Sequence, residues 1–214
     1  MEKQKYPITE YGAVSGGKEL NTKSIQLTID TAYNEGGGVV VVPKGVYLSG
    51  ALFFKQGVDL CVEEGAVLKG SDDISDYPIL KTRIEGETCD YFCALINADN
   101  CNGFCIYGGG IIDGNGQKSW SAFWKRREWN PKCTNKDEQR PRLVYISNSD
   151  SVSITNVTLQ NSHFWTCHLY KCKNSLISSC VVISLGLVEP LPTLLVSSSF
   201  GVINLSSSIP LTAL

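Results

Sequence analysis

The chain has 214 residues, of which 43% are hydrophobic, and a formal net charge of −2 at pH 7. This length and apolar content suit one elongated domain. The small net charge gives no reason to expect a nucleic acid or a membrane as a partner, and no stretch resembles a transmembrane span. Residues 1–7 contain no apolar run, so the chain itself shows no secretory signal peptide.

The first elements expected are a strand and a helix. Residues 8–12 predict a lead-in strand that ends at a glycine turn. A short helix is predicted from Asn21 or Thr22 to the glycines at 36–38, because apolar residues then recur at helical spacing. These residues are Ile25, Ile29, Ala32 and Tyr33.

A series of short strands is expected next, with glycine at nearly every corner. The predicted strands are residues 39–42, 46–48, 51–54, 58–62 and 66–68. Two adjacent carboxylates follow, Asp72 and Asp73, in a polar stretch before Pro78. This position favours a solvated turn over a catalytic pair.

The chain has nine cysteines. Cys89 and Cys93 are four positions apart, which on one face of a strand is roughly 13 Å, too far for a disulfide. A metal site is an alternative, and its candidate ligands are Cys101, Cys105, Cys133, Cys167, His168 and Cys172. Their spacing matches no zinc pattern, so we expect buried structural cysteines, with neither a metal nor another cofactor.

Residues 117–142 form a long excursion rich in tryptophan and basic residues. Long loops on a rigid scaffold are common places for binding residues. Tryptophan faces suit sugar rings, and guanidinium groups suit carboxylates. The predicted substrate-binding residues here and just beyond are Trp124, Trp129, Arg140, Arg142, Trp165 and His168. The alternative is a solvated loop whose tryptophans pack on the wall of the fold.

A repeat organises the second half of the chain. Residues 151–159 align with 174–182 at a constant offset of 23, which places Ile154 on Ile177 and Leu159 on Val182. Such a repeat of short alternating strands predicts a parallel β-helix, in which each coil buries its apolar side chains by stacking on the next. The helix near residue 22 would then cap the first coil. An ordinary β-sandwich is the alternative.

The pattern changes after Ser184. Residues 185–214 contain one charged residue, Glu189, and many serines and prolines, and the repeat is lost. We therefore expect residues 1–184 to form the N-terminal coils of a β-helix, and 185–214 to be an atypical tail foreign to that fold. A stack without a C-terminal cap would expose strand edges, which predicts self-association through that end.

Several motifs in order resemble one family. Residues 39–70, 108–116, 140–144 and 161–168 resemble the N-terminal half of the polygalacturonases, glycoside hydrolase family 28, and the resemblance covers about residues 6–184. It implies an all-β fold, a right-handed parallel β-helix of the pectin-lyase type, here truncated. It also implies hydrolysis of pectin with inversion, an acidic polysaccharide as partner, and the secreted or periplasmic location usual for the family.

The resemblance assigns no catalytic residue. Inversion needs two carboxylates roughly 6.5–9.5 Å apart. The family draws its catalytic groups from Asn-Thr-Asp, Asp-Asp, Gly-His-Gly and Arg-x-Lys motifs, and this chain does not contain them in that order. Asp113 lies in a Gly-rich turn, and His168 lacks carboxylate partners. The expected function is an inactive N-terminal portion of a polygalacturonase-like hydrolase. The alternatives are a non-catalytic acidic-polysaccharide-binding protein and a calcium-dependent pectate lyase.

Overall fold

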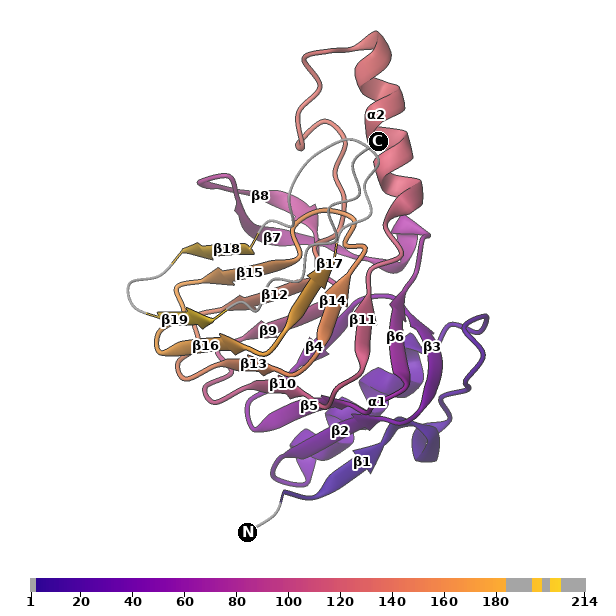
Figure 1. The fold of residues 1–214 in the computed structure, drawn as a ribbon, viewed down its shortest axis with the longest axis vertical. Coiled ribbons are helices and arrows are strands. Elements are labelled where there is room, and N and C mark those ends of the chain that lie inside the picture. The colour runs from indigo at the N-terminus through magenta and orange to yellow at the C-terminus, as the bar shows by residue number, and fades with distance from the viewer. Residues whose placement is uncertain (1–2, 184–193, 198–200, 205–214) are drawn as a thin grey trace.

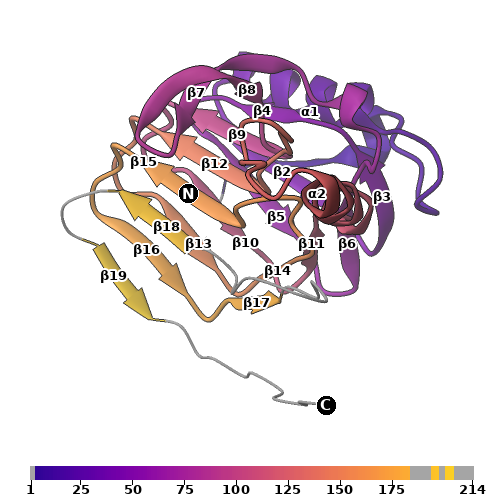
Figure 2. The same ribbon diagram turned by 90° about the horizontal axis from the view of Figure 1, so that it is seen from above.

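The computed structural model describes residues 3–183, 194–197 and 201–204 of the chain, which wind into a right-handed parallel β-helix (Figures 1 and 2). Three parallel sheets form its sides. The first sheet contains β1 (Lys5–Pro7), β2 (Gly38–Val42), β5 (Val58–Val62), β10 (Cys105–Tyr107), β13 (Ser153–Thr155), β16 (Ser175–Ser178) and β19 (Gly201–Asn204). The second contains β3 (Gly45–Ser49), β6 (Ala66–Gly70), β11 (Ile111–Asp113), β14 (Thr158–Gln160) and β17 (Val181–Ile183). The third contains β4 (Leu52–Phe54), β9 (Ile96–Asp99), β12 (Val144–Ser147), β15 (Cys167–Tyr170) and β18 (Leu194–Ser197).

The register of the stacked coils confirms the sequence repeat. Ile154 pairs with Ile177 in the first sheet, and Leu159 pairs with Val182 in the second. Ile106, which lies one coil before Ile154, pairs with it in the same sheet. Because side chains alternate along a strand, equal register keeps each inward residue above the inward residue of the previous coil. The buried residues therefore form one continuous core along the stack.

Left-handed residues turn the coils. At the corner after the third sheet, Asn100, Asn148 and Lys171 have φ of 54°, 50° and 53°. Asparagine tolerates this region better than most residues, so it is the common choice at these bends. Just past the bend, the buried side chains of Cys101 and Cys172 each bond the carbonyl two residues earlier. Several cysteines thus serve as small polar core residues, and all nine thiols are free.

The N-terminal cap forms as predicted, with corrections. Helix α1 (Thr22–Asn34) buries Ile25 and Ile29 over the first coil. Tyr33, which was expected on that face, is 45% exposed because it lies at its edge, where the ammonium of Lys55 lies 5.1 Å from the ring centroid. The lead-in strand was also misplaced: β1 comes earlier, and residues 8–11 form the short 3-10 helix η1 (Ile8–Tyr11).

Two further elements differ from the expectation. Helix α2 (Gln117–Trp129) occupies half of the excursion that was predicted as a loop, and it stands away from the stack (Figure 1). An antiparallel hairpin, β7 (Ile79–Ile84) and β8 (Glu87–Phe92), was not predicted at all. The polar turn before it is structural, as expected. Asp73 caps the 3-10 helix η2 (Ile74–Asp76) by accepting a bond from the Ser75 amide at 2.9 Å.

Part of the segment beyond residue 184 extends the sheets. Strand β18 pairs in parallel with β15, and β19 pairs with β16. These two short strands continue the stack, and the expectation that 185–214 is an atypical tail foreign to the fold stays a prediction. The other residues of 184–214 lie outside the described part of the chain, and a domain boundary at 184 stays a prediction. Within the described residues, neither helix is long and apolar enough to cross a membrane.

The stacked register predicts unequal effects of two matched substitutions. Leu159→Ala removes a fully buried inward side chain and should lower the free energy of unfolding by about 2–5 kcal/mol. Leu176→Ala, on an outward side chain that is 40% exposed, should cost less than about 1 kcal/mol. Urea unfolding of both variants measures the difference, and equal losses would contradict the inward–outward assignment.

Candidate functional site

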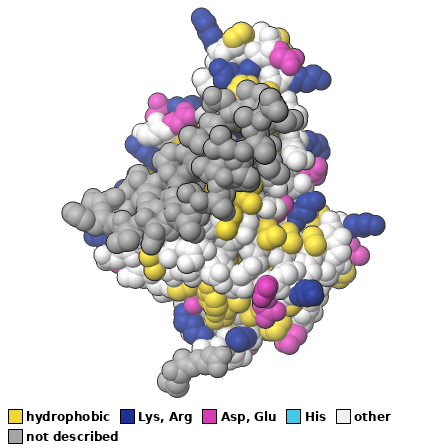
Figure 3. All heavy atoms as spheres, in the orientation of Figure 1, with side chains coloured by type: hydrophobic (Ala, Val, Ile, Leu, Met, Phe, Trp, Pro, Cys, Tyr) yellow, Lys and Arg dark blue, Asp and Glu magenta, His cyan; other side chains and the backbone are white. Residues whose placement is uncertain are grey.

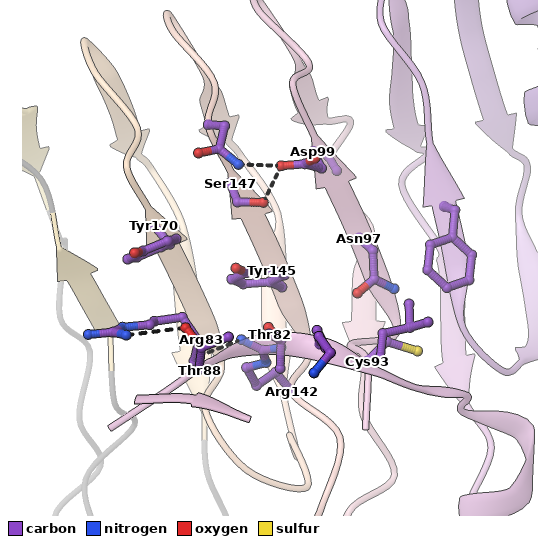
Figure 4. Close-up of a pocket in the computed structure, with 15 residues that line it drawn as sticks. Thr82, Arg83, Thr88, Cys93, Asn97, Asp99, Arg142, Tyr145, Ser147 and Tyr170 are labelled. Atoms are coloured by element: carbon purple, nitrogen blue, oxygen red, sulfur yellow. Dashed lines mark hydrogen bonds between the residues drawn. The ribbon is translucent and has the colours of Figure 1, made fainter. Parts of the chain in front are cut away.

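A groove of about 410 Å³ lies between the outer face of the third sheet and the β7–β8 hairpin (Figure 4). Its lining residues come from β4, β9, β12 and β15, from the hairpin, and from the turns beside them. Segments more than 80 residues apart in the sequence thus meet here because the coils stack. We refer to this cavity as the groove.

The floor of the groove is a ladder of outward side chains. Phe53, Asn97 and Tyr145 are register partners on β4, β9 and β12. A second row follows two residues further along the strands, with Asp99, Ser147 and Tyr170 as partners. The rings of Tyr145 and Tyr170 stand out from neighbouring strands (Figure 4). The floor therefore combines half-buried aromatic faces with polar groups.

The hairpin forms a basic wall. Arg83 is half-buried, and its Nη1 donates to the Thr88 hydroxyl across the hairpin at 3.3 Å. Lys81 also borders the groove, with its ammonium 4.0 Å from the Asp90 carboxylate in an exposed, weak pair. A small apolar cluster of Ile84, Tyr91 and Trp165 anchors the hairpin to the stack. The wall is therefore a fixed part of the fold.

Arg142 lies at the base of this wall and is 1% exposed. Its guanidinium lies 3.9 Å from the centroid of the Tyr145 ring and donates to Thr82 Oγ1 at 2.8 Å and to His168 Nδ1 at 2.9 Å. Among the described residues, no carboxylate forms an ion pair with it. Burial lowers the pKa of Arg142 to about 10, so the side chain stays charged at neutral pH.

The neighbouring imidazole is neutral. Burial, and then the charge of Arg142, lower the pKa of His168 to about 4. A neutral ring leaves Nδ1 free to accept the bond from Arg142. The ring is 2% exposed and packs within about 5 Å of both Tyr145 and Trp165. His168 is therefore a positioning residue for Arg142 and Tyr145 in this geometry.

The groups bordering the groove are positive on balance. Lys81, Arg83 and Arg142 are its cations, and Asp99 is its one carboxylate within the described residues. Asp99 is bonded on its own side of the groove, accepting from Ser147 Oγ at 2.6 Å and Asn148 Nδ2 at 2.7 Å. In a chain of net charge −2, this arrangement is suited to an anionic ligand.

Comparison with known proteins identifies the family. The model of glycosyl hydrolases family 28 matches residues 36–186, which is more than half of the chain. The chain belongs to this family.

Curated relatives and solved structures agree with that assignment. The chain is 31% identical to a probable polygalacturonase of Vitis vinifera over 83% of this chain and 36% of the relative. It is 35% identical to an exo-poly-alpha-D-galacturonosidase of Dickeya chrysanthemi over 69% of this chain and 24% of the relative. The family 28 exopolygalacturonase of Yersinia enterocolitica superposes with a TM-score of 0.73 at 25% identity, covering 86% of this chain and 39% of that one. The matched part of the chain thus spans 36% and 24% of the length of these two curated relatives.

The structure separates the six residues predicted to bind substrate in this family 28 chain. Arg142 borders the groove, and His168 and Trp165 lie buried beside it. Arg140 is 7% exposed, with its guanidinium 3.9 Å from the centroid of the Phe123 ring. The remaining two, Trp124 and Trp129, lie on α2. Substrate contact by any of the six stays a prediction.

Other groove residues were missed by sequence reasoning. They are Phe53, Lys81, Arg83, Asp99, Tyr145 and Tyr170. A usable signal existed for the floor, since residues 97, 145 and 168 hold equivalent outward positions in successive repeats. No such signal existed for the hairpin, which lies outside the repeat. Asp113, in contrast, has the turn role expected of it, accepting from the Asn115 amide at 2.7 Å.

The two buried histidines predict a pH-dependent stability. The pKa of His163 is also lowered to about 4 by burial, so both rings are neutral in the folded state while the unfolded chain takes up protons near pH 6.5. The unfolded state then binds more protons between pH 6.5 and 4, and the free energy of unfolding falls on acidification by up to about 1.4 kcal/mol per pH unit for each histidine.

Urea unfolding at pH 7.5, 6.5, 5.5 and 5.0 measures this slope. The His168→Asn variant should have a shallower slope than the wild type, whatever its stability at pH 7.5. His163→Asn tests the second buried ring in the same way, and its slope should also be shallower than that of the wild type. A slope unchanged in both variants would show that neither ring is held neutral in the folded protein.

Proposed function

We propose that this chain forms the N-terminal part of a galacturonan-acting hydrolase, in which it supplies the first coils of the β-helix and a groove for acidic polysaccharide. The observation that carries the proposal is the positive balance of the groove, with Lys81, Arg83 and Arg142 facing Asp99 across an aromatic floor. Relatives named polygalacturonase and exopolygalacturonase support the same substrate class.

The charges of the groove favour a uronate over a neutral sugar. A guanidinium binds a carboxylate through charge-assisted hydrogen bonds. Arg83 is the best placed of the cations, since it is partly exposed and its guanidinium donates to a neutral group, the Thr88 hydroxyl. Arg142 is too buried for direct contact in this geometry, but its uncompensated charge in a low-dielectric setting makes the groove more positive.

The floor suits the rest of the sugar. Tyr145 and Tyr170 offer flat apolar faces with a polar edge, and Asp99 offers acceptors to sugar hydroxyls. Asn97 is held by the backbone instead, since its amide donates to the carbonyls of Leu52 and Ala94. It shapes the floor and leaves ligand contacts to its neighbours.

The groove lacks the pair of carboxylates that inversion requires. Within the described residues Asp99 has no second carboxylate beside it in the groove, whereas an acid and a base roughly 6.5–9.5 Å apart are needed. We therefore propose that residues 1–214 bind the polymer and do not hydrolyse it. Binding without turnover is also what a non-catalytic polysaccharide-binding protein would show.

Two other hypotheses receive less support. A calcium-dependent lyase needs clustered carboxylates, and among the described residues no group of three or more His, Cys, Asp or Glu side chains is placed to hold a metal ion. Self-association through the C-terminal end of the stack stays a prediction, which light scattering on the purified chain would test.

The first prediction from this proposal concerns catalysis. Purified chain 1–214 should release no reducing sugar from polygalacturonate, because among the described residues Asp99 is the one carboxylate that borders the groove. Reducing-end assays over long incubation measure this directly. Steady turnover that is abolished by a substitution within this chain would overturn the assignment.

The second prediction concerns the basic wall. Arg83→Ala should weaken binding of trigalacturonate by roughly tenfold or more, since a hydrogen bond to a charged group contributes about 1.5–3 kcal/mol. Isothermal titration calorimetry measures the affinity. Lys23→Ala removes an equal charge from the exposed side of α1 and should leave affinity unchanged. Equal affinities of the wild type and Arg83→Ala would remove the groove from the proposal.

A further inference from the structure

The excursion that holds α2 is much more basic than the rest of the chain. Residues 117–142 contain eight Lys and Arg against three Asp and Glu, a balance of +5. Because the whole chain carries −2, the remaining residues carry −7. In Figure 3, several basic side chains lie at the end of the molecule that α2 forms, among others spread over the visible face. Of these basic residues, only Arg142 borders the groove, so the groove does not account for the charge of the excursion.

One face of α2 attaches the helix to the protein. Phe123 is 7% exposed and packs under the guanidinium of Arg140. Trp120 donates its indole N–H to the Ser162 carbonyl at 2.8 Å. Arg127 lies over Trp124, with its guanidinium 5.4 Å from the ring centroid. These contacts account for the aromatic residues on the attached side.

Among the described residues, the other face has no comparable attachment. Lys118, Lys125 and Trp129 fall at positions i, i+7 and i+11, which places them on one side of the helix over roughly 16 Å. All three are exposed, as are the small residues Ser121 and Ala122 between them. Trp129 is 71% exposed. The guanidinium of Arg126 lies over its ring, 5.8 Å from the ring centroid.

The cations on this face are weakly compensated. Arg126 pairs with Glu138 at 2.6 Å, so its charge is largely balanced. Lys118 is 3.9 Å from Asp72, but both side chains are more than half exposed, and such pairs contribute little. A row of two ammonium groups and one open indole face is left for a partner. The partner that fits is a polymer carrying repeated negative charges and ring-shaped apolar faces.

We infer that the exposed face of α2, formed by Lys118, Lys125 and Trp129, is a second binding surface for a long acidic polysaccharide, separate from the groove. This inference rests on the proposed function for its polymer class and adds a site to it. Trp129 would stack on one sugar ring, and the two lysines would meet carboxylates along the same chain. Two sites on one polymer raise the apparent affinity, whereas a short oligomer that fills the groove gains nothing from the second.

The test compares a polymer with an oligomer. Binding of polygalacturonate and of trigalacturonate is measured for the wild type, Trp129→Ala, and the double variant Lys118→Ala/Lys125→Ala. Each α2 variant should weaken polymer binding by roughly fivefold and leave trigalacturonate binding unchanged. The double variant should also reduce the salt dependence of polymer binding, because it removes two exposed charges.

Matched controls are available on and beside α1. Lys18→Ala/Lys23→Ala makes the same charge change with two exposed lysines, and Leu27→Ala removes an exposed apolar side chain that is 54% exposed. Neither should alter polymer binding. Circular dichroism of the α2 variants checks that the helix is retained.

The outcomes separate this inference from the proposed function. Unchanged polymer binding in both α2 variants, with Arg83→Ala still weakening both ligands, would overturn the second surface and leave the groove in place. Equal binding of a neutral galactan would overturn the charge argument. A dimer of the wild type that Trp129→Ala dissociates would assign this face to a second copy of the chain and overturn the inference. If Arg83→Ala left the affinity for both ligands unchanged, that result would contradict the groove site and would not bear on the second surface.

Discussion

The fold depends on one packing constraint: a single coil of this chain cannot bury its own apolar side chains. Ile106, Ile154 and Ile177 become buried because each is stacked in register on the equivalent residue of the next coil. A shift of one residue in any strand would turn its inward set to the outside. The same register therefore determines which side chains face outward, and the floor of the groove is a by-product of the core.

Electrostatics in the groove depend on a charge, that of Arg142, with which no carboxylate of the described residues forms an ion pair. Arg142 is buried against the Tyr145 ring and the hairpin, with neutral partners in Thr82 and His168. Burying a charge without a counter-ion is unfavourable, and its multiple hydrogen bonds offset part of that cost. A carboxylate partner would have cancelled the field at the groove. The arrangement thus keeps a positive site next to an aromatic floor.

The parallel β-helix gives the molecule a rigid scaffold with additions at its corners. The hairpin and α2 are both inserted at the corner between the second and third sheets, and neither disturbs the register on either side of it. Such insertions alter the surface next to the third sheet without changing the core. Fold and function are therefore decided by different residues. The coils place the third sheet, and the insertions decide the shape and charge beside it.

Sequence alone determined the features that arise from local periodicity. The 23-residue repeat predicted the pairing of Ile154 with Ile177, and helical spacing predicted that Ile25 and Ile29 would cap the first coil. Both follow because burial on one face imposes a period that neighbouring residues record.

Only the tertiary structure decided what lies in the groove. Arg83 and Tyr170 border one cavity although 87 positions separate them, and no local pattern records such a meeting. Arg140 and Arg142 belong to a basic stretch that was predicted to bind substrate, and both are buried because the hairpin and α2 fold over them. Burial of a charged side chain depends on which other segments pack against it. The sequence therefore indicated a binding region, and the stacking of the coils determined which residues reach its surface.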